Sequence, residues 1–285
     1  MFNRTKTPAM DNSKDHERPV YRDPNDLKGQ VAVISGSTSG IGLALARAVA
    51  ARGGDVVLNG LGDPSEIERT RAELEASCGV RVRYHAANML RGDEVADMVA
   101  FGKHQLGRVD ILVNNAGIQH VESVEKFPSD QWEKIIAINL SSTFYATRAA
   151  IPIMKAQGRG RIVNIASAHG LVASPFKSAY VAAKHGVLGF TKTVALELAQ
   201  DNITCNAICP GFVETPLVAA QIADQARINN ISKEAALKDI ILESQPTKRF
   251  VTTDELAGIF LYLVSDLGAS ANGASFSIDG GWTAK

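Results

Sequence analysis

Val31-Ala-Val-Ile-Ser-Gly36-Ser-Thr-Ser-Gly40-Ile-Gly42 is the stretch that decides the fold of this 285-residue chain. Its first residues are apolar and mostly β-branched, which is typical of a strand buried on both faces. Three glycines follow in the spacing G-x-x-x-G-x-G, and a helical pattern then runs from Ile41 to Arg52. A strand that passes through a glycine-rich turn into a helix begins a βαβ unit. The stretch therefore predicts an α/β protein with a parallel sheet.

The rest of the chain repeats this alternation of short strands and longer helices. Further strands are predicted at residues 55–59, 81–85, 111–113, 161–165, 203–208 and 274–278, and helices at 64–78, 93–106, 129–157, 180–199, 215–243 and 254–267. Such alternation favours a parallel sheet with helices on both faces and right-handed crossovers. We expect one Rossmann-type, doubly wound domain of about seven strands over residues 28–285.

Two segments fall outside this regular pattern. Residues 1–27 are polar, mixed in charge and contain three prolines, so we expect a poorly ordered extension rather than a secretion signal or a transit peptide. Residues 215–245 are charged and less regular than the other helices. Long insertions of this kind often close over ligands, and we expect a helical substrate lid here.

The composition excludes several classes of partner. Lys and Arg together number 30, as do Asp and Glu, and this balance does not favour nucleic acid or an anionic membrane as partner. No apolar run approaches the roughly 20 residues that cross a bilayer. The three cysteines are widely spaced and odd in number, which indicates a reducing cytoplasm rather than a disulfide framework. No metal site is expected, because Cys205 and Cys209 lie in an apolar run without paired histidines.

The glycine-rich turn has the features of a phosphate cradle. Glycine lets the backbone turn tightly and approach a pyrophosphate closely, and the N-terminus of the following helix supplies free N–H groups. No Gly-Lys-Ser/Thr follows the turn, so it is not a Walker loop. Its position in the first βα unit favours a bound dinucleotide over a plain glycine-rich turn.

The end of the second predicted strand bears on which dinucleotide binds. Asn59-Gly-Leu-Gly-Asp63 follows the strand where a Rossmann-type fold meets the adenosine ribose. A ribose 2′-phosphate would need Arg or Lys here or in the glycine loop, and the nearest such residue is Arg69. The sequence therefore favours NAD over NADP. Asp63 has two possible roles: to reach the ribose, or to cap the helix that begins near Pro64.

Tyr180 and Lys184 form the strongest catalytic candidate. They are four residues apart, which places both side chains on one face of a helix. A phenol with its ordinary pKa of about 10 is a poor base at neutral pH, and a nearby cation favours the phenolate. We therefore expect Lys184 to lower the pKa of Tyr180 and make it a general base. Ser167, thirteen residues before Tyr180, is the candidate donor to a substrate oxygen.

Together with Asn114-Asn-Ala-Gly117 and Pro210-Gly211, these motifs resemble the short-chain dehydrogenase/reductase family over residues 29–285. The resemblance implies an NAD-dependent oxidoreductase with Asn139, Ser167, Tyr180 and Lys184 as catalytic residues, Asn139 holding a water that links Lys184 to solvent. It implies that the cofactor contacts Gly36, Thr38, Gly40, Ile41, Gly42, Leu61, Asn88, Met89, Asn115, Tyr180, Lys184, Pro210, Val213 and Thr215. It also implies a homotetramer assembled through the helices at 129–157 and 180–199, with the C-terminal strand and Trp282 as a further interface.

Several stretches are more similar to one subfamily, the bacterial D-3-hydroxybutyrate dehydrogenases. They are residues 115–120, 166–173, 177–180, 215–218 and 279–282. This resemblance implies reversible oxidation of (R)-3-hydroxybutyrate to acetoacetate, with a substrate site formed by Gln119, Ser167, His169, Lys177, Tyr180, Phe212 and Gln221. In this subfamily Gln119, His169, Lys177 and Gln221 correspond to the residues that hold the substrate carboxylate. Lys177 lies at a helix start, where a cation is ordinarily unfavourable, so a nearby anion would explain it.

The chain departs from the subfamily at two positions, and other functions stay open. We would expect Trp at Phe212 and Asp at Asn88, so the first departure concerns substrate size and the second concerns the cofactor. Alternative functions are another enzyme of the family, such as a 3-oxoacyl-carrier-protein reductase or a sugar dehydrogenase, and a non-catalytic NAD-sensing protein. His85, His104 and His120 are assigned to packing or solvent.

Overall fold

The computed structural model describes residues 26–284 and shows seven parallel strands in one sheet, in the order β3-β2-β1-β4-β5-β6-β7. The strands are β1 (Val31–Ile34), β2 (Asp55–Asn59), β3 (Val82–His85), β4 (Ile111–Asn114), β5 (Gly160–Ile165), β6 (Ile203–Pro210) and β7 (Ser275–Ile278). The doubly wound, Rossmann-type architecture predicted from the sequence is confirmed. The predicted extension at residues 1–27 lies almost wholly outside the described residues. Leu27 is already part of the fold, because its side chain is buried in the core.

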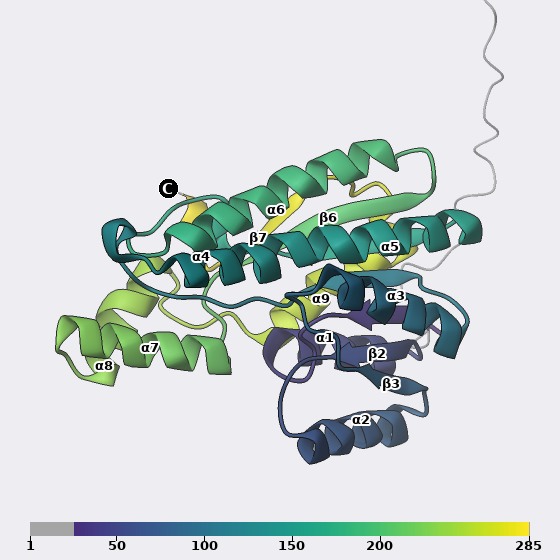
Figure 1. The fold of residues 1–285 in the computed structure, drawn as a ribbon, viewed down its shortest axis with the longest axis horizontal. Coiled ribbons are helices and arrows are strands. Elements are labelled where there is room, and N and C mark those ends of the chain that lie inside the picture. Colours follow the sequence, from purple (N-terminus) through teal and green to yellow (C-terminus); the bar gives the residue numbers. More distant parts are fainter. Residues whose placement is uncertain (1–25, 285) are drawn as a thin grey trace, which may run out of the picture.

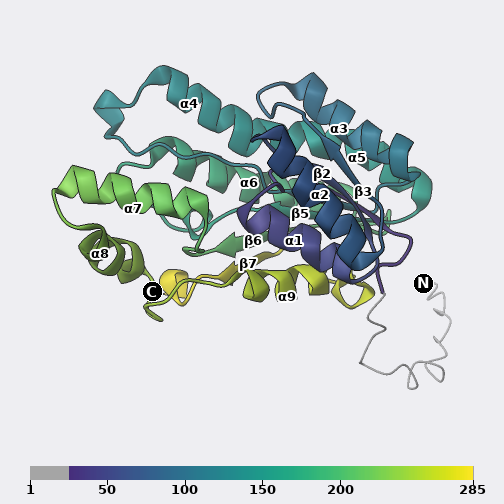
Figure 2. The ribbon, with the colours of Figure 1, turned by 90° about the horizontal axis from the view of Figure 1, so that it is seen from below.

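Helices cover both faces of the sheet (Figures 1 and 2). They are α1 (Gly40–Ala51), α2 (Pro64–Cys78), α3 (Gly92–Leu106), α4 (Ser129–Ile136), α5 (Ser142–Gln157), α6 (Ser178–Glu197), α7 (Pro216–Asn229), α8 (Lys233–Ala236) and α9 (Thr253–Val264). Side chains of α1, α2 and α9 pack on one face, and those of α3, α5 and α6 pack on the other. The lobe of α7 and α8 projects beyond the sheet in Figure 1.

The apolar strand β1 shows why the sheet needs both layers. Ile34 belongs to the cluster formed with α1 and α9, whereas Val33 belongs to the cluster formed with α3 and α5. Both side chains are fully buried, because successive residues of a strand point to opposite faces. Burial of each such side chain contributes about 1.5–3 kcal/mol, so removing either layer of helices would expose a whole face of the sheet.

The strand order reverses between β1 and β4, and this reversal positions the site. From β1 the chain builds outward to β2 and β3, then returns to place β4 on the other side of β1. The loops that follow β1 and β4 diverge there and leave a crevice at the carboxyl edge of the sheet. Asn115, directly after β4, fixes the two loops together, since its Nδ2 donates to the carbonyl oxygens of Ser35 (3.0 Å) and Gly36 (2.8 Å).

Two predicted helices are less regular in the structure. The helix predicted at 129–157 is divided into α4 and α5 by a π-helical turn at Ala137–Ser141. The segment predicted as helical at 215–243 consists of α7, α8, a π-helical turn at Leu237–Ile241 and a 3₁₀ turn at Leu242–Ser244. Among the described residues, no helix is long and apolar enough to cross a membrane.

Candidate active site

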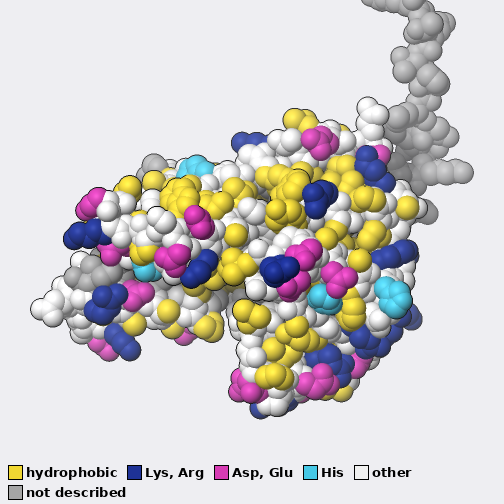
Figure 3. All heavy atoms as spheres, in the orientation of Figure 1, with side chains coloured by type: hydrophobic (Ala, Val, Ile, Leu, Met, Phe, Trp, Pro, Cys, Tyr) yellow, Lys and Arg dark blue, Asp and Glu magenta, His cyan; other side chains and the backbone are white. Residues whose placement is uncertain are grey.

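A cleft of about 370 Å³ lies at the carboxyl edge of the sheet, between the loops after β1, β4, β5 and β6 and the start of α7. Figure 3 shows the surface indented between the lobe of α7 and α8 and the part that carries α1 and α2. All but three of the residues expected to bind cofactor or substrate or to act in catalysis line this cleft. The exceptions are Gly42, Asn139 and Lys177, which lie immediately behind its wall.

The glycine loop is shaped for a group that approaches the backbone closely. Gly36 has φ 60°, and a Cβ atom there would lie only 2.9 Å from the Cα atom of Ala116. Glycine is thus required both by conformation and by space. Ser39, the N-cap of α1, makes no side-chain capping hydrogen bond, and the first turn of this described helix contains no acidic residue. The helix N-terminus therefore faces the cleft without a competing anion, and it fits a pyrophosphate.

At the end of the cleft expected to hold the adenosine, Asn59 connects the surrounding loops and Leu61 is exposed to solvent. Asn59 accepts from the backbone N–H of Gly36 (3.1 Å) and donates to the carbonyl oxygens of His85 and Ala87 (both 3.0 Å), so its side chain ties β2 to both neighbouring loops. Leu61 is 77% exposed at the rim. Of the described residues that line the cleft, Lys184 on α6 is the only lysine or arginine.

Asp63 caps α2. Its Oδ1 accepts from the backbone N–H groups of Ser65 (2.9 Å) and Glu66 (3.1 Å). Hydrogen bonds from the Ser65 hydroxyl and then the Glu66 N–H lower the pKa of this carboxyl group below its usual value. Of the two roles that the sequence allowed for Asp63, the structure therefore shows the helix cap.

Helix α6 carries Tyr180 and Lys184 into the floor of the cleft. Lys184 Nζ donates to the carbonyl oxygen of Ile165 (2.7 Å) and lies 5.6 Å from the centre of the Tyr180 ring. Burial lowers the pKa of Lys184 to about 8. Burial also raises the pKa of Tyr180, and a hydrogen bond with Ser167 only partly opposes it. In the protein alone the pKa of Tyr180 is therefore raised rather than lowered as expected, because burial has the largest effect on it.

Ser167 lies two residues after β5, where it caps the 3₁₀ turn Ala168–Gly170, and its side chain contacts His169. Its Oγ accepts from the backbone N–H of His169 (3.1 Å) and lies 3.5 Å from the Nδ1 atom of the same residue. The other ring nitrogen, Nε2, lies 2.9 Å from Ser174 Oγ. Burial, followed by the charge of Lys177, lowers the pKa of His169 to about 3, so this imidazole is neutral.

Asn139 lies in the π-helical turn between α4 and α5 and is buried. Its Oδ1 accepts from the N–H of Ile118, and its Nδ2 donates to the carbonyl oxygen of the same residue, both at 2.9 Å. The side chain thus fastens the loop after β4 to the α4–α5 junction. Both ends of the Asn139 amide are therefore bonded to the backbone of Ile118, the residue before Gln119.

At the far end of the cleft, one buried ammonium group has no carboxylate partner and one buried amide has no hydrogen-bond partner among the described residues. Lys177 is only 6% exposed, and its Nζ lies 3.5 Å from Gln221 Oε1 and 5.3 Å from the centre of the Phe212 ring. Among the described residues no carboxylate forms an ion pair with it, and burial lowers its pKa to about 8. Nearby in the lining, Gln119 Nε2 is buried without a hydrogen-bond partner in the described chain.

Trp282 is a site residue that sequence reasoning assigned only to a possible interface. Its ring stacks on Phe212 (5.1 Å, 17°) and meets His169 edge-on (4.8 Å, 82°), so it forms part of the cleft wall. Asp279 holds the turn that places it, accepting from Gly281 N and Thr283 N at 3.0 Å each. Residues 279–282 were singled out in the sequence for their similarity to the hydroxybutyrate dehydrogenases, but their proximity to β6 depends on the whole sheet.

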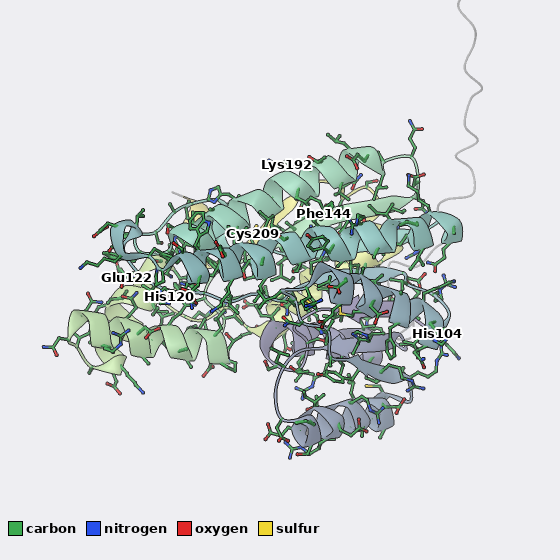
Figure 4. The ribbon with its side chains drawn as sticks, in the orientation of Figure 1. His104, His120, Glu122, Phe144, Lys192 and Cys209 are labelled. Atoms are coloured by element: carbon green, nitrogen blue, oxygen red, sulfur yellow. The ribbon has the colours of Figure 1, made fainter. Side chains whose placement is uncertain are left out.

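Among residues 26–284, the other histidines and the buried cysteines do not line the cleft. His104 lies at the end of α3, far from the loop that carries His120 (Figure 4), and His85 contacts Asp97 (3.1 Å). His120 packs edge-on against Phe127. Cys205 and Cys209 are buried in β6, and burial raises the pKa of both thiols, to about 12 and about 11. No group of metal-ligating side chains occurs among residues 26–284.

Comparison with known proteins agrees with this geometry. Residues 30–226 match the model of a family described as short chain dehydrogenase. The chain is 55% identical over 256 residues to D-beta-hydroxybutyrate dehydrogenase of Rhizobium meliloti, covering 90% of this chain and 99% of the relative. The protein of that name from Cupriavidus necator is 50% identical, covering 91% and 100%. Among solved structures, an actinorhodin polyketide ketoreductase variant with NADPH has a TM-score of 0.85 and 34% identity, covering 90% and 98%.

Proposed function

Since this chain belongs to the short chain dehydrogenase family, we propose that it catalyses the reversible, NAD-dependent oxidation of (R)-3-hydroxybutyrate to acetoacetate. Three features support this activity: the fold, the catalytic side chains and the polar end of the cleft. It assigns the open N-terminus of α1 to the cofactor pyrophosphate and the end with Lys177 to the substrate carboxylate.

A nicotinamide cofactor fits the cleft because the Gly36 backbone closes on Ala116 and leaves the end of α1 open. When bound as NAD, it would bring a positive charge and accept the hydride from the substrate carbon. NAD is favoured over NADP because no basic residue lines the adenosine end among the described residues. Asn88 and Met89 would contact the adenine there, and Lys184 would contact the nicotinamide ribose.

Tyr180, Ser167 and Lys184 would handle the proton and the oxygen of the substrate. Tyr180 would take the hydroxyl proton as the carbonyl forms, while Ser167 would donate a hydrogen bond to the same oxygen. Because burial raises the pKa of Tyr180, the phenol is protonated in the protein alone and serves as the acid in acetoacetate reduction. In oxidation, Lys184 stabilises the phenolate, and its fixed bond to Ile165 holds the ammonium beneath the ring.

The observation that carries the choice of substrate is the buried ammonium of Lys177. A buried charge costs several kcal/mol unless it is paired, and no described carboxylate pairs with this one. Gln119 adds a buried donor without an acceptor, and Gln221 contacts the ammonium through its oxygen. A small carboxylate would satisfy Lys177 and Gln119 at once. This arrangement favours a short hydroxy acid over a neutral sugar.

Initial rates of NADH formation test the proposal, using (R)- and (S)-3-hydroxybutyrate with NAD and then NADP. We expect turnover with the (R) isomer and NAD, and little with the other combinations. Lys177→Met should raise KM for (R)-3-hydroxybutyrate roughly 100-fold, because truncating one partner of a buried charged contact costs about 2–5 kcal/mol. The KM for a neutral secondary alcohol should change less than about twofold.

Lys192→Met is the matched control, since Lys192 lies on the same helix and is exposed (Figure 4). It should leave both KM values unchanged. Equal losses for the acid and the neutral alcohol in Lys177→Met would contradict the carboxylate role. Turnover of a sugar or a carrier-bound acyl group in preference to 3-hydroxybutyrate would replace the proposed substrate.

We also propose three wider properties. Residues 215–245 act as a lid, because Gln221 and the start of α7 line the cleft from one side only. The chain forms a homotetramer through the helical face of α4, α5 and α6. It works in the cytoplasm, which suits the free thiols of Cys78, Cys205 and Cys209.

A further inference from the structure

Gln245 is a buried residue that the proposed mechanism does not use. It directly follows the 3₁₀ turn Leu242–Ser244 at the end of the lid segment, and it is 0% exposed. Its Oε1 accepts from the backbone N–H of Phe212, and its Nε2 donates to the carbonyl oxygen of Arg249 (2.6 Å). Both ends of the amide are therefore bonded to backbone, and one of them holds a residue that lines the cleft.

Phe212 is held through both of its backbone polar groups. Its N–H donates to Gln245, and its carbonyl oxygen accepts from the N–H of Val251 (2.9 Å), beside a parallel bridge between Val213 and Val251. These contacts join the residues that precede the lid segment to those that follow it. The two ends of the lid segment therefore meet at Phe212, and Gln245 supplies a side-chain contact between them.

Gln245 also lies against the turn that carries Trp282. A Cβ atom placed on Gly280 would lie 3.5 Å from Gln245 Nε2, so the amide and this turn are in close contact. The N–H of Thr247 donates to the carbonyl oxygen of Gly280 (3.2 Å), which bonds the segment after Gln245 to the same turn. The amide therefore touches the two backbone segments whose rings, Phe212 and Trp282, stack in the cleft wall with 5.1 Å between their centres.

The Gln245 amide cannot be removed without a change in this wall. Its loss leaves the N–H of Phe212 without an acceptor, and Phe212 is only 7% exposed. A buried donor without a partner is unfavourable, so the chain would move until this N–H reached water or another acceptor. Such a movement would carry the Phe212 ring away from Trp282. Lys177 Nζ lies 5.3 Å from the centre of the Phe212 ring, so the space beside the proposed carboxylate site would widen.

We propose that Gln245 is a positioning residue that limits the length of the acid the cleft accepts: its amide holds Phe212 against Trp282, and this aromatic pair closes the space beside Lys177. The inference rests on the proposed function, in which Lys177 binds the carboxylate of a hydroxy acid. Gln245 does not itself line the cleft and acts through Phe212. With the pair held, the space suits 3-hydroxybutyrate; once the pair is released, it should admit 3-hydroxypentanoate, which is longer by one methylene group.

Tryptophan fluorescence reports on this pair without any need for turnover. The chain has two tryptophans, so Trp132→Phe leaves Trp282 as the only one that emits. In that background Gln245→Met, which keeps the length of the side chain and removes both hydrogen bonds, should shift the emission to longer wavelength and increase its quenching by acrylamide. Gln245→Glu should restore the emission at pH 6, because burial raises the pKa of a carboxyl group and the neutral acid offers both an acceptor and a donor.

Kinetics supply the second readout, the ratio of kcat/KM for (R)-3-hydroxybutyrate to that for (R)-3-hydroxypentanoate. One methylene group changes kcat/KM by about 10- to 200-fold in a fitted pocket, so Gln245→Met should lower this ratio roughly tenfold. The KM for the shorter acid should rise while its kcat stays within about threefold, because the catalytic side chains keep their contacts. If Gln245→Met does not fold, Gln245→Asn, which is too short to reach both backbone groups, should show the same changes.

Gln157→Met is the matched control. Gln157 also accepts from a backbone N–H and donates to a carbonyl oxygen, both of Val109, at 3.1 Å and 2.8 Å. Val109 lies just before β4, at the edge of the sheet away from the cleft. The control should lose stability as Gln245→Met does, yet keep the Trp282 emission and the substrate ratio of the unaltered protein. Equal changes of emission and ratio in both variants would mean that Gln245 has only a general structural role.

The two readouts separate failure of this inference from failure of the proposed function. An unchanged Trp282 emission in Gln245→Met would refute the positioning role, whatever the substrate is. A shifted emission with an unchanged substrate ratio would refute the limit on acid length. If the unaltered protein turns over neither acid, the proposed function fails and the limit on acid length fails with it, while the emission still decides whether Gln245 holds Phe212 against Trp282.

Discussion

The pKa values of the catalytic residues in this site depend more on burial than on their neighbours in sequence. The i, i+4 spacing placed Tyr180 and Lys184 together correctly, but spacing alone does not reveal how far both are removed from water. Burial raises the pKa of Tyr180 and lowers that of Lys184 to about 8, so both shifts oppose the charged forms. Oxidation therefore has to gain phenolate from alkaline pH or from charges near the ring.

The pH dependence follows from these directions. Tyr180 acts as base only when deprotonated, and its pKa is raised, so kcat for oxidation should climb with pH across the neutral range. Lys177 is cationic only below its pKa of about 8, so affinity for the carboxylate should be lost as pH rises through that value. KM for (R)-3-hydroxybutyrate should then increase about tenfold per pH unit. His169, with a pKa of about 3, stays neutral throughout.

Steady-state rates from pH 6 to pH 10 check this prediction. Lys184 also has a pKa of about 8, so kcat alone cannot identify Lys177. Lys177→Met separates the two: KM should be high and independent of pH, while the kcat profile keeps its shape. A KM that still rises above pH 8 in this variant would assign the loss to another group. Tyr180→Phe should bind NAD and lack turnover at every pH.

At the scale of elements, a buried polar ladder holds the centre of the sheet to the helices above it. Asn114 on β4 donates to Asn164 on β5 (2.8 Å) and to Thr147 on α5 (3.2 Å). Asn164 donates in turn to Thr191 on α6 (2.8 Å). All four side chains are buried, so each hydrogen bond replaces one to water. The ladder fixes α5 and α6 against the strands that lead to Asn115 and Ser167.

Asn164→Ala should lower the free energy of unfolding by roughly 2–3 kcal/mol, because it removes the buried hydrogen bonds that Asn164 makes with Asn114 and Thr191 and leaves each of them one partner short. Urea denaturation followed by circular dichroism measures the change. Asn229→Ala on the exposed surface of α7 is the control and should stay within about 0.5 kcal/mol. A loss as small as that of the control would mean that the ladder contributes little to stability.

The sequence predicted the strands and most helices closely because their patterns are local. The bounds of α2 match the prediction at both ends, where Pro64 begins the helix and Gly79, with φ 65°, ends it. The π-helical turn that holds Asn139 was missed, since its residues are ordinary helix formers. Trp282 was not assigned to the site because its place depends on β7 reaching β6, a contact between distant segments.

At the scale of the whole molecule, the outer helical layer of α4, α5 and α6 carries several large exposed apolar side chains. Hydrophobic side chains gather over α4, α5 and α6 in Figure 3. Trp132, Phe144 and Leu196 are exposed there, and Leu196 is 81% exposed. Arg148 lies over the rings of Phe144 (5.1 Å) and Tyr145 (5.4 Å). A helical face with exposed aromatic rings of this kind marks an interaction surface, and a second copy of the chain would cover it.

Phe144 lies on the front of α5 (Figure 4), which makes it the residue to test. Around a twofold axis an isologous contact brings the same surface of two copies together, so Phe144→Glu would place like charges near each other in an apolar interface. Light scattering should show a tetramer for the unaltered chain and a smaller species for the variant. Val124→Glu, which alters an exposed residue outside these helices, should remain tetrameric. A tetramer that survives Phe144→Glu would move the interface elsewhere, and a monomeric unaltered chain would refute assembly altogether.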